Sequence, residues 1–106
     1  MATMDAIQEL AQRIAREFRP KRIILFGSYA YGTPHDGSDV DLLVVLPFKG
    51  NSLTKAIEIL DRVEPEFPVD LLARTPRDVR RRLAWDDYFL REIMERGRVL
   101  YEAAYP

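Results

Sequence analysis

The sequence predicts an α/β protein in which helices cover a small mixed sheet. Three observations support this class. Helical and strand-like patterns alternate along the chain, which is typical of a sheet packed against helices. Residues 40–46 are apolar at both odd and even positions, as in a central strand covered on both faces. The chain has 106 residues, of which 47% are apolar and 31% charged, and this length and composition suit one globular domain spanning residues 1–106.

The first half of the chain begins with an amphipathic helix. Apolar residues recur at helical spacing over residues 4–18, with Thr3 as a capping residue and Pro20 as the stop. Residues 22–26 (RIILF) are rich in strand-forming types and predict a short strand. Residues 28–38 contain several turn formers and predict a loop, with at most one helical turn at its start.

The second half of the chain continues the alternation. After the central strand, a helix is expected to be capped by Ser52 and stopped by Pro65, and residues 68–72 (PVDLL) predict a third strand. The expected buried face of the helix after Ser52 consists of Leu53, Ala56, Ile57, Leu60 and Val63.

The last segments predict helical structure and an edge strand. Thr75 and Pro76 mark a helix start, and this helix either continues into residues 85–96 or bends before them. Gly97 suits a helix end, and residues 98–101 predict an edge strand. The residues expected to pack in the core or at a subunit interface are Trp85, Tyr88, Phe89 and Ile93.

Composition excludes several functional classes. With no Cys and one His, a disulfide scaffold, a thiolate zinc site and a His-rich metal site are ruled out. A net charge of −1 argues against nucleic-acid binding that depends on phosphate contacts. No apolar run approaches the length of a membrane span, and the N-terminus does not resemble a signal peptide. We therefore expect a cytoplasmic protein with no membrane partner.

Two carboxylates stand at the entry of the most apolar predicted strand. Asp39 and Asp41 are two residues apart, so on a strand they share one face. Like charges that close repel by about 1 kcal/mol in water, and by more in a protein. A divalent cation resolves the repulsion, since carboxylate oxygens suit Mg²⁺ or Mn²⁺. The alternative is that both are water-exposed turn or strand-edge residues.

A third carboxylate, Asp70, interrupts the next predicted strand. If the two strands are neighbours, three carboxylates converge, which is the donor set that a two-metal phosphoryl or nucleotidyl transfer site requires. Gly27 and Ser28 leave the first strand at a turn whose backbone N–H groups and hydroxyl suit phosphate. Ser38 directly precedes the carboxylate pair and is placed to orient it by hydrogen bonding. Asp70 alternatively bonds a neighbouring backbone, and Ser28 alternatively caps the turn.

The stretch Gly27-Ser28, ten residues, then Asp39-Val40-Asp41 resembles the G-S-x10-D-x-D signature of the DNA-polymerase-β-like nucleotidyltransferase superfamily. The short chain and the later Val-Asp-Leu strand look like its minimal nucleotidyltransferase (MNT) branch, over roughly residues 5–101. The resemblance implies the polymerase-β-like fold and ATP as donor. It implies two Mg²⁺ ions on Asp39, Asp41 and Asp70, and nucleotide phosphates at Gly27 and Ser28.

The resemblance also implies a partner. Minimal nucleotidyltransferases are typically antitoxins of helical HEPN-domain toxins, and well-studied relatives transfer AMP to a toxin tyrosine. We expect the same activity here, with a homo- or hetero-oligomer possible. Two alternatives stay open: an antitoxin that neutralises its toxin by binding alone, and the catalytic subunit of a small-molecule adenylyltransferase of the antibiotic-modifying type.

His35 is expected to be an exposed loop residue. The arginines of residues 77–82 are expected to form a solvated face balanced by Asp78, Asp86 and Asp87.

Overall fold

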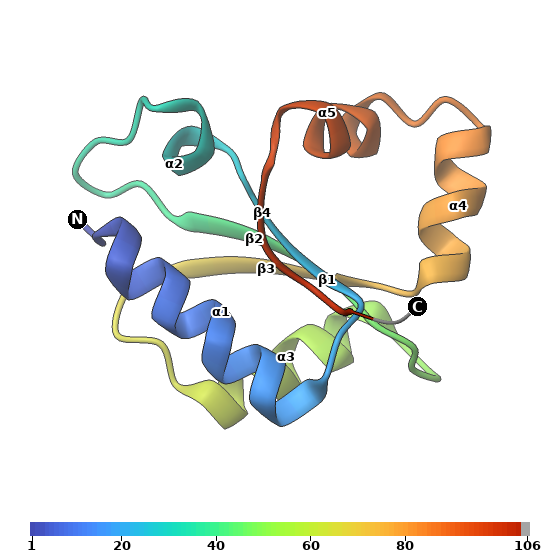
Figure 1. Ribbon diagram of the computed structural model, residues 1–106, viewed down its shortest axis with the longest axis horizontal. Coiled ribbons are helices and arrows are strands. Elements are labelled where there is room, and N and C mark those ends of the chain that lie inside the picture. Colours follow the sequence, from blue (N-terminus) through green and yellow to red (C-terminus); the bar gives the residue numbers. More distant parts are fainter. Residues whose placement is uncertain (105–106) are drawn as a thin grey trace.

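Four strands form one mixed sheet in the order β3-β2-β1-β4 in the computed structural model, which describes residues 1–104 (Figure 1). β1 is antiparallel to both β2 and β4, whereas β2 and β3 are parallel. The strands are β1 (Arg22–Phe26), β2 (Val40–Val45), β3 (Val69–Arg74) and β4 (Arg98–Glu102). The helices are α1 (Met4–Phe18), α2 (Ser28–Tyr31), α3 (Ser52–Val63), α4 (Pro76–Ala84) and α5 (Tyr88–Arg96). The predicted class, a small mixed sheet covered by helices, is confirmed.

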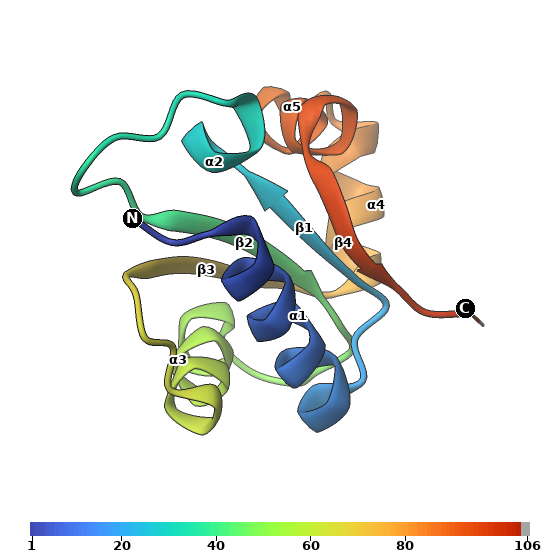
Figure 2. The ribbon, with the colours of Figure 1, turned by 60° about the vertical axis from the view of Figure 1, so that its left-hand side comes forward.

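The helices cover both faces of the sheet. α1 and α3 lie on one face, and α4 and α5 lie on the other, as both views show (Figures 1 and 2). β2 serves both layers because its side chains alternate. Leu42 and Val44 pack with α1 and α3, whereas Leu43 and Val45 pack with α5 and α4. The central strand that was predicted from apolar residues at both parities is therefore confirmed.

Several local predictions are confirmed. α1 has the predicted bounds, and the hydroxyl of Thr3 accepts a hydrogen bond from the backbone N–H of Ala6 (3.0 Å). β1 also has the predicted bounds, and α2 is the one helical turn at the start of the loop. At the start of α4, Thr75 caps the backbone N–H of Asp78 (3.0 Å) and Pro76 is the first helical residue.

The predictions for α3 need correction. The helix is capped by Asn51 and not by Ser52: the side-chain oxygen of Asn51 accepts from the N–H groups of Leu53 (2.7 Å) and Thr54 (3.2 Å). Asn51 is extended, as a capping residue must be, whereas Ser52 is already helical. The predicted buried face was also wrong in part, because Leu53 and Ile57 are exposed and Ile59 is fully buried. The helix carries apolar residues around much of its surface, and the position of β3 and α1 decides which side is covered.

The C-terminal predictions also change. β3 extends to Arg74. Of the two alternatives for the helix that begins at Pro76, the bend is confirmed: α4 ends at Ala84, and the second helix begins at Tyr88 instead of Trp85. Asp86 adopts a left-handed conformation (φ 57°) that turns the chain, and Asp87 caps α5. The turn leaves Trp85, Tyr88 and Phe89 exposed; their exposed fractions are 72%, 87% and 55%. Ile93 is buried as expected, so the core assignment was wrong for the other three side chains.

The last predictions concern β4 and membrane spans. β4 is an edge strand, as expected, and runs one residue beyond the predicted end. Within residues 1–104, no helix combines the length and the apolar character needed to cross a membrane.

Candidate functional site

Asp41 and Asp70 lie side by side on neighbouring strands. β2 and β3 are parallel, and the register pairs Asp41 directly with Asp70. Neighbouring strands lie about 4.8 Å apart. Both residues share strand parity with side chains that pack toward α4 and α5, so both carboxylates project from that face of the sheet. The expectation that the two acidic strands are neighbours is confirmed.

The carboxylate of Asp41 rests against the backbone of Gly27. Gly27 ends β1 with a φ of +72°, which favours glycine. A Cβ atom at this position would lie 2.0 Å from Oδ2 of Asp41, so any side chain would displace the carboxylate. Glycine at residue 27 therefore serves two needs, the turn after β1 and the approach of Asp41. Thirteen residues lie between Gly27 and Asp41 in the sequence, and the antiparallel pairing of β1 with β2 brings the two together.

Asp41 is reluctant to ionise. Burial raises its pKa to about 6, and the neighbouring carboxylates of Asp70 and Asp39 add to the rise. Asp39 itself is exposed, just before β2 begins. None of the ion pairs among the described residues involves Asp39, Asp41 or Asp70. The site therefore concentrates negative charge that no ion pair among residues 1–104 offsets.

The carboxylates of Asp39, Asp41 and Asp70 are suitable ligands for a divalent cation, although they do not lie close enough together to surround one. In residues 1–104, no three His, Cys, Asp or Glu side chains are gathered closely enough to hold a metal ion. Carboxylates that repel one another are expected to stay apart until a cation lies between them. Their oxygen atoms are the ligands that Mg²⁺ prefers. The three residues fit such an ion by type and by strand position.

The turn after β1 presents backbone amides beside Asp41. Carbonyl Gly27 accepts from the N–H groups of both Ala30 and Tyr31 (3.0 Å each), which closes the single turn of α2. The N–H groups of Ser28 and Tyr29 come before the first of these hydrogen bonds, and the first N–H groups of a helix have no carbonyl partner within it. Tyr29 and Ala30 pack toward α1 and α3. The remaining two residues, Ser28 and Tyr31, are three apart and share the opposite side of α2.

Ser38 takes part in the loop before β2. Its hydroxyl accepts from the backbone N–H of His35 (3.0 Å), and its own N–H donates to carbonyl His35 (2.9 Å). Among the hydrogen bonds of residues 1–104, none joins the Ser38 hydroxyl to Asp39 or Asp41, and its contact is with the loop backbone. His35 is exposed, as expected.

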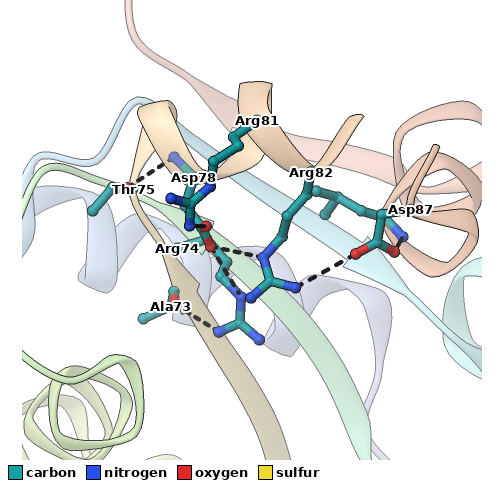
Figure 3. Close-up of polar contacts among 8 residues, drawn as sticks. Ala73, Arg74, Thr75, Asp78, Arg81, Arg82 and Asp87 are labelled. Carbon is teal, nitrogen blue, oxygen red and sulfur yellow. Dashed lines mark hydrogen bonds and ion pairs between the residues drawn. The ribbon is translucent and has the colours of Figure 1, made fainter. Parts of the chain in front are cut away.

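Arg81 and Arg82 of α4, together with Arg74 at the end of β3, form a network around Asp78 (Figure 3). Asp78 pairs with Arg81 (2.7 Å), Arg82 (2.9 Å) and Arg74 (3.8 Å). Although burial alone would raise the pKa of Asp78, the hydrogen bonds from Arg82 and Arg81 hold it below its usual value. Asp87 pairs with Arg82 as expected, whereas Asp86 pairs with Arg91. Much of this charge is therefore balanced locally.

One basic residue beside α2 was not singled out from the sequence. The guanidinium of Arg96, in the last turn of α5, lies 4.3 Å from the ring centroid of Tyr31. The helix can approach β1 here because Gly97 follows: a Cβ on Gly97 would lie 2.6 Å from Cγ2 of Ile24. No local pattern in the sequence marks Arg96, because its contact with Tyr31 joins residues far apart in the chain.

The sequence is similar to that of known proteins. Residues 7–100 match the family described as nucleotidyltransferase domain. A relative from Methanocaldococcus jannaschii, named "Putative protein adenylyltransferase", is 30% identical over 100 residues, which cover 91% of this chain and 95% of the relative.

Two solved structures share the fold. A "putative nucleotidyltransferase" from Sulfolobus solfataricus superposes with a TM-score of 0.66 at 18% identity, over 95% of this chain and 81% of that one. A toxin–antitoxin crystal structure with AMP-PNP gives 0.59 at 22% identity, over 92% of this chain and 74% of that one.

Proposed function

Because this chain belongs to the nucleotidyltransferase domain family and is a nucleotidyltransferase, we propose that it transfers AMP from ATP to a hydroxyl group of a partner toxin, of the HEPN type, and acts as its antitoxin. The observation that carries the proposal is the direct pairing of Asp41 with Asp70, with Gly27 against Asp41. This arrangement brings carboxylates next to a turn with backbone N–H groups. A nucleoside triphosphate bound with its cations needs both, because carboxylates bind the cations and N–H groups bind the phosphates.

Each residue has a separate task in the proposed reaction. Asp39 and Asp41 would hold the cation that accompanies the triphosphate, and Asp70 would serve the second cation, as ligand, as base or as both. When bound, Mg²⁺ supplies charge neutralisation for the phosphates and a lower pKa for the attacking hydroxyl. The amides and hydroxyl of the Gly27–Ser28 turn donate hydrogen bonds to phosphate oxygens.

The reaction is a displacement at the α-phosphorus of ATP. The acceptor oxygen forms a new bond to this phosphorus, and the bond to the pyrophosphate oxygen breaks. Asp70 is the more exposed of the two paired carboxylates, which suits a group that receives the hydroxyl proton and passes it to water. The products are an AMP ester of the acceptor and pyrophosphate.

The comparisons support a protein acceptor. The Methanocaldococcus jannaschii relative is named for protein adenylylation, and a structural neighbour is a toxin–antitoxin pair that contains an ATP analogue. We infer a toxin tyrosine as the acceptor from the resemblance of the Gly27-to-Asp41 motif to minimal nucleotidyltransferases.

The test first looks for a helical HEPN-type protein encoded next to this chain, then mixes its product with the chain, ATP and Mg²⁺ and follows the mixture by intact-mass spectrometry and a toxin activity assay. A catalytic antitoxin acts below equimolar amounts and leaves its target one or more AMP units heavier. The Asp39→Asn/Asp41→Asn variant should still bind the partner but should neither modify nor neutralise it. Full neutralisation by this variant with no added mass would establish binding alone as the mechanism.

A further inference from the structure

We propose that Arg96 is a phosphate-binding residue of the nucleotide site, held in place by the ring of Tyr31 and restrained by Glu92. This inference rests on the proposed function, because it takes the Gly27–Ser28 turn to be where the nucleotide phosphates bind. The resemblance to known motifs does not include Arg96, which lies about seventy residues after this turn in the sequence.

The first argument is the side of α2 on which the guanidinium lies. Tyr29 and Ala30 face α1 and α3, so Ser28 and Tyr31 face the other way. That side of the sheet also carries Asp41 and Asp70. Arg96 stacks at 4.3 Å on Tyr31, so its positive charge stands on the same side as the hydroxyl of Ser28 and the carboxylates.

The second argument is the chemistry of the contact. An aromatic face holds a guanidinium in position while its N–H donors remain directed outward around the edge of the plane. Arg96 gives one donor to Glu92 (Nη1 to Oε1, 3.1 Å), and a guanidinium has five. Both side chains of this pair are exposed, so the pair contributes little stability and can yield to a phosphate.

The third argument is the charge balance of the site. Asp39, Asp41 and Asp70 bring three carboxylates, and none of them has an ion pair among the described residues. A triphosphate adds further negative charge. Arg81 and Arg82 of α4 pair with Asp78, Arg82 also pairs with Asp87, and Arg74 pairs with Asp78 as well. Arg96, on α5, contacts α2 at Tyr31, three residues after Ser28, which puts its guanidinium on the helical turn that follows Gly27.

The experiment measures Mg²⁺-dependent binding of AMP-PNP to the full chain by calorimetry. Arg96→Met should weaken binding by at least about tenfold, the loss expected for a charge-assisted hydrogen bond to phosphate. Arg96→Lys should recover part of the affinity, because it restores the charge without the planar fork. Arg91→Met is the matched control: it removes an arginine from the same helix that pairs with Asp86, and it should leave the affinity unchanged.

Two further measurements separate a phosphate contact from a purely structural clamp between α2 and α5. The affinity of the wild-type chain should fall more steeply with salt than that of Arg96→Met, because only the wild type has the extra charge contact. Glu92→Gln should tighten binding by releasing the guanidinium, whereas Glu95→Gln, on the same helix, should not. Melting temperatures establish that each variant is folded.

The outcomes distinguish the two proposals. Wild-type binding that Arg96→Met leaves within about twofold overturns the inference and leaves the proposed function intact. Weaker binding with an unchanged salt dependence also overturns it, in favour of the clamp. Failure of the wild-type chain to bind AMP-PNP with Mg²⁺ overturns the proposed function, and the role of Arg96 with it.

Discussion

The side-chain oxygen Oδ2 of Asp41 occupies the space that a Cβ on residue 27 would need, at a distance of 2.0 Å. Gly27 also has a positive φ, but so does Gly32, around which a Cβ would meet nothing within 4 Å. Gly32 is therefore needed only for its backbone conformation, whereas Gly27 is also needed to leave room for the Asp41 carboxylate.

Gly27→Ala should abolish transfer, because the new methyl group displaces the Asp41 carboxylate from the turn. It should also lower the free energy of unfolding by about 1–3 kcal/mol or more, because φ 72° and ψ −160° is a conformation that essentially only glycine adopts and the methyl group adds the clash with Asp41. Gly32→Ala should show only the conformational cost and retain activity. Chemical denaturation and an AMP-transfer assay measure both effects, and equal activity losses in the two variants would contradict the close contact.

Asp41→Asn should raise the melting temperature of the nucleotide-free chain at pH 8. The pKa of Asp41 is about 6 in the folded chain, above its value in the unfolded chain, so folding is favoured when this group is protonated and is penalised above pH 6. The advantage of the variant should disappear as the pH falls from 6 to below 4. Asp61→Asn on the exposed surface of α3 is the control and should show no such trend. A lower melting temperature for Asp41→Asn at pH 8 would argue against mutual repulsion.

The three carboxylates should divide binding from turnover. Asp39→Asn and Asp41→Asn should weaken Mg²⁺-dependent AMP-PNP binding and abolish transfer, since both accompany the triphosphate in the proposed site. Asp70→Asn should retain much of the affinity and lose about a thousandfold in turnover, equivalent to about 4 kcal/mol of transition-state stabilisation. Equal losses of affinity in all three variants would contradict this division.

Asp78→Asn should destabilise the fold by about 1 kcal/mol at pH 7, because it leaves the arginines of α4 without their shared carboxylate. The pKa of Asp78 is lowered in the folded chain, so its contribution is present above the ordinary aspartate pKa and is lost as the pH falls through the lowered value. The matched control is Asp86→Asn, whose exposed pair with Arg91 should contribute little. Urea denaturation at pH 7 and at pH 3 measures the difference, and a pH-independent effect would exclude the ionic contribution.

Helix and strand positions could be predicted where local rules agreed. α1 combined a capping Thr3, an apolar stripe and Pro20, and its bounds were confirmed at both ends. The errors arose where local signals competed. Asn51 and Ser52 are both good capping residues in adjacent positions, and the chain uses the first. At residues 85–96 an aromatic pattern at helical spacing suggested burial, but the left-handed turn at Asp86 directs Trp85 and Tyr88 to solvent.

The sequence by itself determined the chemical content of the site. Asp41 and Asp70 interrupt apolar strands, Asp39 directly precedes one, and Gly27-Ser28 ends another. Residue type and strand parity are local properties that the chain carries before it folds. Only the tertiary structure decided their mutual placement. The parallel pairing of β2 with β3 sets Asp41 opposite Asp70, and the antiparallel pairing of β1 with β2 sets Gly27 against Asp41. The packing of α5 brings Arg96 onto Tyr31. These are contacts between residues far apart in sequence, and they depend on which strands and helices pack together, which no local pattern specifies.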